Sequence, residues 1–463
     1  MQVSFKKKIY HSLKENSTIL FIALITLIPI TVITIFNSFS LLLLFIIIFI
    51  SVIILFVFNF DIIFAFFLIT IFIDGYLYSY AISEIFSTIL IFIFFVTHKI
   101  SWNDLKNPFL FGFLILLISI IPSLINSDIP FLSTFLSLRL SLFFILMLLL
   151  TNYFMDRSRY EYFVITFLGI SLINAIILIG DALKSGSRSF GFAGIMYVDI
   201  VGISIVLSLT FLLYHKRNKF IYFILFFVFT IALLLTQTRN AWVSSGIIIF
   251  GIWFQYMLRL KKESMDYIKA ILISIIIGGL LALAVLKINQ SDSSVLERVN
   301  ISSLSNNKDV DGYIKTAGSL VSRVFIWETA LNAFIAHPIT GIGLYTFPVL
   351  SGNYFTISPN LFQLYVANLS PHETFIAILC EAGILGFIGL VFFLSITIYK
   401  TWHVMKDAKN EIDKFYSTLM FWLIAYIFIS MLMTDAWLWG RLFMLWCVIL
   451  SMSAANIKST LKT

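Results

Sequence analysis

Charged residues are scarce in this sequence, and the scarcity excludes an ordinary soluble domain. Only 12% of the 463 residues are charged, whereas 60% are hydrophobic. Soluble domains carry about 25% charged residues. Because long apolar runs recur along almost the whole chain, the composition predicts a protein that lies in a membrane.

Cysteine is also nearly absent. The two cysteines, Cys380 and Cys447, lie far apart in apolar runs, which excludes a disulfide framework or a cysteine metal site. We expect them to be small buried side chains. Blocks of basic residues interleaved with aromatic residues are lacking outside the apolar runs, which argues against nucleic acid as a partner.

The apolar runs do not alternate with polar residues, as the strands of a membrane β-barrel would. The sequence therefore predicts an all-α polytopic membrane protein with about 12–14 transmembrane helices of about 20 residues each. A basic, polar segment precedes the first run without a small-residue cleavage site, which predicts a retained first helix. The candidate spans are residues 17–36, 39–58, 60–80, 82–97, 108–125, 134–151, 161–180, 194–214, 219–237, 240–258, 268–286, 374–399, 414–433 and 437–455.

The distribution of basic residues predicts the sidedness. Most of the 31 lysine and arginine residues fall at the termini and in alternate loops, so we expect these loops and both termini to be cytoplasmic. The chain then divides into a membrane bundle of about 11 helices over residues 1–286, one large extracytoplasmic loop over 287–373, and about three further helices over 374–463. The outer set carries only Lys184, Arg188, Arg239, Lys287, Arg298, Lys308, Lys315 and Arg323.

The large loop contains one clear helical pattern. It opens with a polar stretch, QSDSSVLERVNISSLSNNKDVDG, which we expect to be irregular. Apolar residues then recur at helical spacing from Val324 to Ile335, and Pro338 stops the pattern. Gly341 and Gly343 predict the turn that follows.

Chemistry-bearing residues gather on the outer side. Arg188, Arg239 and Arg323 lie there on a face that is otherwise poor in charge. The guanidinium fork binds anionic oxygens in pairs, so these arginines are candidates to clamp a lipid diphosphate. Each alone could be a solvated side chain at a helix end. Three together favour the binding role.

Two histidines share that side. His372, with Glu373 beside it, opens a span and is a candidate general base, although a helix-start residue is the alternative. His337, just before Pro338, is better explained as the end of a helix.

Further charged residues are open to both functional and structural interpretations. Arg139 and Arg441 fall within predicted spans, where charge usually marks function or a buried partner. Asp435 is a candidate structural partner for Arg441. Asp309 and Asp311 have the spacing of a metal-binding pair, but a solvated loop explains them better.

Several stretches resemble the O-antigen ligase and polymerase superfamily of bacterial inner-membrane glycosyltransferases. TQTRNAWVSSG resembles the arginine-bearing helix start of the family, with Arg239 as the matching residue. SRVFIWETALNAFIAHPITGIGLYTF resembles the beginning of its large periplasmic loop. Its residues in register are Arg323, Trp327, Pro338, Gly341 and Gly343.

The histidine motif of the family has a counterpart in SPHETFIAILCEAGILGFIGL. There His372 is followed by Gly383 and Gly386, with Glu381 before the first glycine. RSFGFAG resembles the other arginine-bearing outer loop and would make Arg188 its arginine. The resemblance covers residues 185–395. It departs from the family pattern at Glu373, where an uncharged polar residue is usual, and at IMYVD, where asparagine is expected.

The resemblance implies a GT-C-like membrane enzyme that transfers a glycan with inversion and without a metal or another cofactor. The donor would be a glycan on undecaprenyl diphosphate. The acceptor would be lipid A core or an equivalent for a ligase, and the next lipid-linked repeat unit for a polymerase. His372 would be the base, and Arg188, Arg239 and Arg323 would stabilise the diphosphate leaving group.

Two other classes of protein remain alternatives. Transporters and lipid flippases often show repeated halves, and no internal repeat is visible in this sequence. A scaffold without catalytic activity would not need a histidine and three arginines facing one compartment. The sequence favours the ligase over the polymerase only slightly, through the spacing from His372 to Gly383.

Overall fold

The computed structural model describes residues 60–72, 106–185, 189–215, 218–259, 310–434 and 440–460, and isolated positions between 83 and 91. The described part is helical and contains no β-strand. Eight of its helical segments are long and apolar enough to cross a membrane. This confirms the predicted all-α polytopic membrane fold, while the spans predicted at 17–36, 39–58 and 268–286 lie outside the described residues.

The helices of the bundle follow the predicted spans closely. They are α4 (Phe60–Phe72), α7 (Pro108–Ser119), α8 (Ile121–Ile125), α9 (Pro130–Tyr153), α10 (Ser158–Ser185), α11 (Tyr197–Tyr214), α12 (Lys219–Leu235), α13 (Arg239–Arg259), α20 (Thr374–Asp407), α21 (Glu411–Met431) and α22 (Gly440–Thr460).

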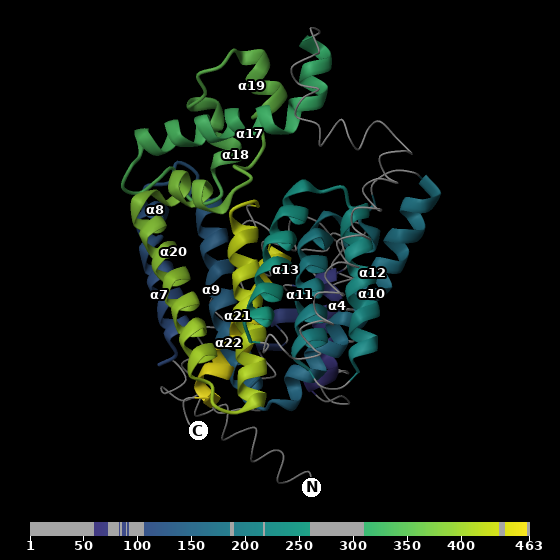
Figure 1. Ribbon diagram of the computed structural model, residues 1–463. Helices are drawn as coiled ribbons and strands as arrows, with labels where there is room; N and C mark the ends of the chain where they lie inside the picture. Colours follow the sequence, from purple (N-terminus) through teal and green to yellow (C-terminus); the bar gives the residue numbers. More distant parts are fainter. Residues whose placement is uncertain are drawn as a thin grey trace, which may run out of the picture.

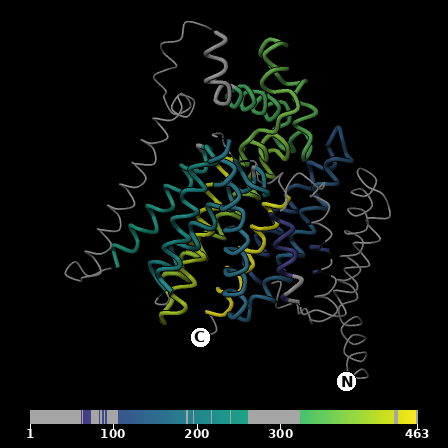
Figure 2. Tube along the Cα trace, turned by 90° about the vertical axis from the view of Figure 1, so that its right-hand side faces the viewer, coloured from purple at the N-terminus to yellow at the C-terminus, as the bar shows by residue number. Residues whose placement is uncertain are grey.

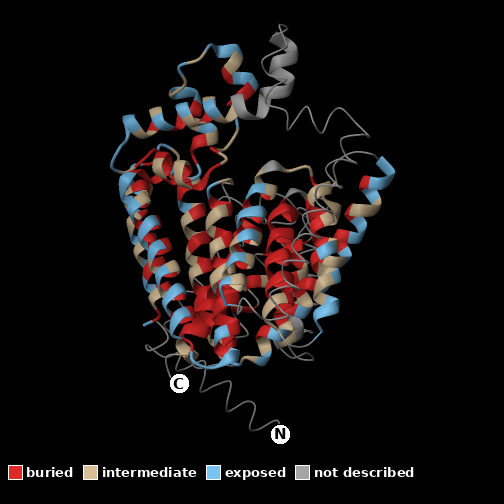
Figure 3. Cartoon of the chain, viewed as in Figure 1, coloured by how far each residue is buried: buried red, intermediate tan, exposed pale blue. Residues whose placement is uncertain are grey.

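Large apolar side chains line both the interior and the outer surface of this bundle. Buried residues fill its centre, while exposed positions follow the outer faces of helices such as α10 and α20 (Figure 3). Many of these exposed side chains are isoleucine or phenylalanine, among them Ile165 and Phe250. Such a surface is stable in lipid, where exposed apolar side chains carry no hydrophobic cost.

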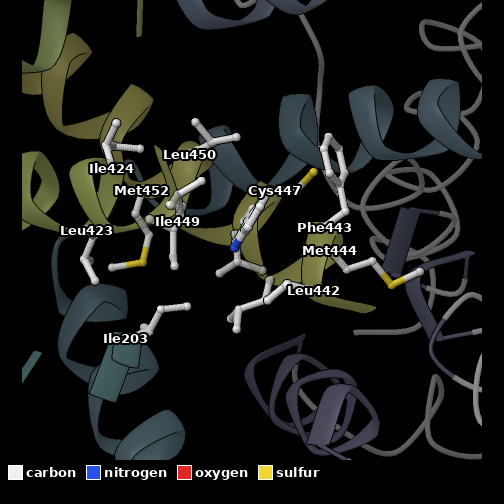
Figure 4. Packing of buried hydrophobic residues seen from close by; sticks show 14 of the residues in the cluster. Ile203, Leu423, Ile424, Leu442, Phe443, Met444, Cys447, Ile449, Leu450 and Met452 are labelled. Carbon is white, nitrogen blue, oxygen red and sulfur yellow. The ribbon is translucent and has the colours of Figure 1, made fainter. Parts of the chain in front are cut away.

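The bundle core is made by helices far apart in sequence. Side chains of α22, such as Ile449 and Met452, lie close to Leu423 of α21, with Ile203 of α11 beside them (Figure 4). α20 packs on α7, and α9 packs on α22. The C-terminal helix is therefore central to the bundle.

A smaller helical group sits across one end of the bundle (Figures 1 and 2). It consists of α17 (Val310–Ala336), α18 (Phe347–Leu350) and α19 (Pro359–Tyr365), with its own apolar core around Ile326, Ala330 and Phe362. We call this end of the bundle the loop end. α22 finishes at the opposite end (Figure 1).

The helix predicted from Val324 to Ile335 is confirmed as part of α17, which stops at Ala336, before Pro338. One expectation was wrong in part. The polar stretch that ends at Gly312 was expected to be irregular, but α17 already begins at Val310. The rest of the stretch, up to residue 309, lies outside the described residues.

Candidate functional site

The backbone at His372 has an unusual conformation. Its φ angle is 55°, in the left-handed region that costs energy for residues other than glycine. The side chain of Glu373 caps α20 by accepting hydrogen bonds from the backbone N–H groups of Phe375, at 3.1 Å, and Ile376, at 2.5 Å. Burial raises the pKa of this carboxyl, while the two backbone donors lower it. Glu373 therefore has a structural task, helix capping, directly beside the candidate base.

The helix α17 holds the same turn from the loop side. The indole Nε1 of Trp327 donates a hydrogen bond to the carbonyl oxygen of Pro371, 3.0 Å away. On the same helix, Ser322 Oγ donates to the carbonyl oxygen of Tyr365, at 2.7 Å, which ties α17 to the end of α19. The position of His372 thus depends on the large loop as well as on α20.

Arg323 lies one helical turn before Trp327 and faces the start of α13. Its Nη1 is 3.4 Å from Oδ1 of Asn240. Asn240 directly follows Arg239, the first residue of α13, as expected from the predicted helix start. The structure therefore brings the Arg323 side chain to the backbone position of Arg239, whose side chain is outside the described part.

The end of α21 and the turn after it join α13 to α20. We call these residues, 430–434, the α21 terminus. Asn240 Nδ2 donates to the carbonyl oxygen of Met433 at 3.0 Å, and Thr374 Oγ1 donates to that of Thr434 at 2.6 Å. Since Thr374 begins α20 just after Glu373, the histidine turn and the start of α13 are both attached to the α21 terminus.

The glycines of two separate motifs form one interlocked structure. Gly383 interrupts α20 with a φ of 64°, and a Cβ atom there would lie 2.4 Å from the carbonyl oxygen of Ile339. The backbone N–H of Ile384 donates to Pro338, at 2.9 Å, and that of Gly343 donates to Glu381, also at 2.9 Å. We call residues 338–343 and 380–384 the glycine clasp.

Glu381 lies within the clasp and its carboxylate faces the loop. It accepts hydrogen bonds from the backbone N–H groups of Tyr345, at 2.9 Å, and Phe347, at 3.3 Å. Tyr345 itself has a φ of 60°. Glu381 thus fixes the segment after the clasp. Gly386 follows Ala382 by one helical turn. A Cβ atom on Gly386 would lie 2.3 Å from the Cβ of Ala382, so glycine permits the close approach of these two residues.

Arg139 and the start of α22 are in direct contact inside the bundle. A Cβ atom on Gly440 would lie 1.7 Å from Nη2 of Arg139, so a side chain there would require the guanidinium to move. Arg441 is the next residue, and both arginines are buried. The Arg139 guanidinium also lies over the ring of Phe143, 5.9 Å from its centre.

Several predicted residues fall elsewhere. Asp435, the candidate partner of Arg441, and the residues Arg188 and Asp309 lie outside the described residues. His337 is exposed at the end of α17, and its Nε2 is 3.2 Å from the hydroxyl of Tyr354. Cys380 and Cys447 are buried and free, as expected.

Sequence reasoning missed the polar residues that connect the motifs. Asn240, Thr374, Ser430 and Thr434 are uncharged, and each lies at a helix end at the loop end. The available signal was their position: Asn240 follows a candidate arginine, and Thr374 follows the candidate base by two residues.

Comparison with known proteins shows that part of this chain is similar to polysaccharide ligases. The segment 224–391 matches the family model described as O-antigen ligase. A putative polysaccharide ligase of Rickettsia typhi is 29% identical over 236 residues, which cover 49% of this chain and 50% of the relative. A putative polysaccharide ligase of Rickettsia prowazekii is 28% identical over 239 residues, which cover 51% of this chain and 52% of the relative.

A third relative, a putative polysaccharide ligase of Rickettsia conorii, is 31% identical over 140 residues, which are 30% of this chain and 33% of the relative. The matches to the first two span about half the length of those curated relatives. Together the matches confirm the resemblance that the sequence motifs indicated, and the family segment contains Arg239, Arg323 and His372.

Proposed function

We propose, on the premise that this chain resembles the O-antigen ligase superfamily, that it is an O-antigen ligase-type glycosyltransferase. It moves a glycan en bloc from undecaprenyl diphosphate to a sugar hydroxyl of lipid A core or an equivalent acceptor. One observation carries the proposal: the His372 turn, Arg323 and the start of α13 are joined around the α21 terminus at the loop end.

The reaction is a single displacement at the anomeric carbon. The acceptor oxygen forms the new glycosidic bond while the bond from the anomeric carbon to the diphosphate oxygen breaks, so the configuration inverts. The acceptor proton passes to His372, and undecaprenyl diphosphate leaves as an anion. A positioned base and preorganised cations are the two groups that this reaction needs from the protein.

Arg188, Arg239 and Arg323 are the proposed cations for the diphosphate. Their charge replaces a metal, because guanidinium groups in a partly dehydrated site stabilise developing negative charge strongly. Arg323 is held at the start of α13 by Asn240, which supports its place beside Arg239. Replacing Arg323 by alanine should weaken donor binding, whereas lysine should restore only part of it because it lacks the planar fork.

We also propose the orientation. The loop end faces the outer side of the bacterial inner membrane, and both termini are cytoplasmic, since basic residues cluster in the opposite set of loops. The lipid carrier enters sideways from the outer leaflet, and the large loop covers its headgroup. Membrane lipids and the lipid-linked glycan are therefore the partners of this enzyme.

The decisive experiment is transfer by the purified protein in nanodiscs. Lipid-linked glycan is supplied with and without lipid A core, and the products are separated by size. A product of unchanged glycan length that requires the acceptor supports the ligase. A ladder of longer lipid-linked chains without added acceptor would instead establish the polymerase. Intact donor in both reactions would contradict glycosyl transfer and favour a transporter or flippase.

A second experiment tests the proposed independence from metal. The transfer reaction is repeated in excess EDTA, and we expect its rate to stay unchanged because the arginines carry the electrostatic role. Loss of activity that added Mg²⁺ or Mn²⁺ restores would contradict this and bring Asp309 and Asp311 back as candidate ligands.

A further inference from the structure

A buried carboxylate lies beneath the candidate site, at the last position of the IMYVD stretch, where the sequence departs from the family pattern. Asp199 sits in the first turn of α11 and is only 7% exposed. Ser430 Oγ donates a hydrogen bond to its Oδ1. A buried carboxylate is costly unless it is hydrogen-bonded, and the N-terminal end of a helix stabilises it further. Asp199 lies outside the segment 224–391 that matches the family.

The contact with Ser430 closes a tight interface between α11 and α21. Gly202, one turn along α11 from Asp199, packs against the ring of Tyr426, one turn before Ser430. A Cβ atom on Gly202 would lie 1.9 Å from the Tyr426 hydroxyl oxygen. The two contacts together fix both the distance between the helices and the position of the last turn of α21.

Hydrogen bonds lead from Ser430 to the candidate site. The carbonyl oxygen of Ser430 accepts from Thr434 Oγ1 at 3.0 Å, which shapes the α21 terminus. The next two links are those already described: Met433 holds Asn240, which faces Arg323, and Thr434 holds Thr374 at the start of α20. Asp199 is thus the innermost member of a connected polar network that reaches Arg323 and Thr374, which follows His372 by two residues.

We propose that Asp199 is a positioning residue for glycan transfer. Its carboxylate holds Ser430, and the α21 terminus in turn sets the relative positions of Arg323 and the His372 turn. In this role Asp199 acts through Ser430 rather than through contact with the substrate. The inference rests on the proposed transferase function and adds a residue from α11 to it.

Three variants and one control test this role in nanodiscs. Asp199→Ala and Ser430→Ala remove the contact, the second by deleting only a hydroxyl. Asp199→Asn keeps an oxygen that accepts the Ser430 hydrogen bond. Ser204→Ala is the matched control. Ser204 lies on α11, as Asp199 does, and its buried hydroxyl is hydrogen-bonded to Ser171 of α10 at 2.7 Å, away from the α21 terminus.

The measurements are kcat and KM for transfer, the Kd of a polyprenyl diphosphate probe, and the melting temperature. We expect Asp199→Ala and Ser430→Ala to have a kcat/KM roughly tenfold or more below that of Ser204→Ala, because small displacements of reacting groups slow the transfer strongly. The melting temperatures of the three variants should be similar. Asp199→Asn should recover most of the loss. This pattern separates positioning from general stabilisation.

Other results would overturn the proposal. Equal kcat/KM in Ser430→Ala and the Ser204→Ala control would show that the contact is only structural. An Asp199→Asn variant as defective as Asp199→Ala would show that the hydrogen bond to Ser430 is not how Asp199 acts. A wild-type protein that neither binds the diphosphate probe nor transfers glycan would overturn the proposed function and the positioning role together.

Discussion

The indole of Trp327 donates its hydrogen bond to the carbonyl oxygen of Pro371, the residue directly before His372, at 3.0 Å. This contact joins the large loop to the turn that presents the candidate base. It also explains why an aromatic residue with a polar N–H stands one turn after Arg323 on α17. The loop is therefore part of the candidate site.

The first prediction concerns this hydrogen bond. Trp327→Phe keeps an aromatic ring but removes the donor, so the His372 turn loses its support from α17. We expect the free energy of unfolding to fall by about 1 kcal/mol. Transfer should fall by roughly tenfold because the base is displaced. Melting curves and the nanodisc transfer assay measure both effects.

Trp422→Phe is the matched control for Trp327→Phe. Its Nε1 donates to Gln255 Oε1 at 2.7 Å between α21 and α13, away from the histidine turn. The control should lose similar stability and keep its transfer rate. If both variants lose transfer equally, the Trp327–Pro371 contact has no special role in the site.

The second prediction separates the chemistry of His372 from its backbone. His372→Asn preserves the left-handed conformation, since asparagine tolerates a positive φ better than most residues. The variant should therefore fold with a melting temperature close to that of the wild type. Without a general base, transfer should fall by about 10²- to 10⁴-fold. Full activity in this variant would mean that His372 is not the base.

The third prediction is a pH dependence of stability at Glu373. Burial raises the pKa of this carboxyl above its ordinary value of 4.5. The folded protein then holds the proton more tightly than the unfolded chain does. The contribution of this group to stability is therefore full below the ordinary pKa and is lost as the pH rises through the raised pKa.

Glu373→Gln removes this titration while keeping an oxygen that can cap α20. The wild type should gain melting temperature relative to the variant as the pH is lowered from about 7 towards about 4.5. Melting curves in detergent at a series of pH values provide the comparison. A difference between the two proteins that is constant with pH would contradict the raised pKa.

The fourth prediction concerns the glycine clasp. Gly383→Ala places a Cβ atom 2.4 Å from the carbonyl oxygen of Ile339 and imposes a left-handed φ on alanine. The two backbone segments of the clasp are hydrogen-bonded to each other and cannot separate to relieve the contact. We therefore expect the free energy of unfolding to fall by roughly 2 kcal/mol or more. Thermal melting in detergent is the measurement.

Gly180→Ala on α10 is the control for the clasp. A Cβ atom there meets nothing within 4 Å, and alanine favours the helix more than glycine does. The control should therefore be neutral or slightly stabilising. A Gly383→Ala protein as stable as this control would show that the clasp tolerates a side chain.

The described spans and the start of α13 were predictable because they depend on local sequence. The apolar run at 108–125 corresponds to α7 and α8, and Arg239 begins α13 as its motif indicated. His372 and Arg323 were identified as candidates because charge is rare in this chain. Their roles in transfer remain predictions, as do those of Arg188, Asp435 and the arginine side chain at position 239.

The contacts within the site were not predictable. Gly341, Gly343 and Gly383 belong to two motifs and appeared as separate turn signals, yet they interlock. Glu381 was only a possible supporting residue beside a glycine, and the structure shows its carboxylate holding two backbone N–H groups of the loop. Asp199 entered only as the last residue of IMYVD, a departure from the family pattern, and a single acid in an apolar run does not say what it faces.

The sequence by itself determined that this is a multi-pass helical membrane protein, where the spans of the described part lie, and which residues can carry chemistry. Only the tertiary structure decided which helix ends meet. The partners Trp327 and Pro371 are 44 residues apart, Asn240 and Met433 are 193 apart, and Asp199 and Ser430 are 231 apart. The physical reason is that lipid-facing and buried faces of these helices are equally apolar, so hydropathy cannot reveal which faces pack together.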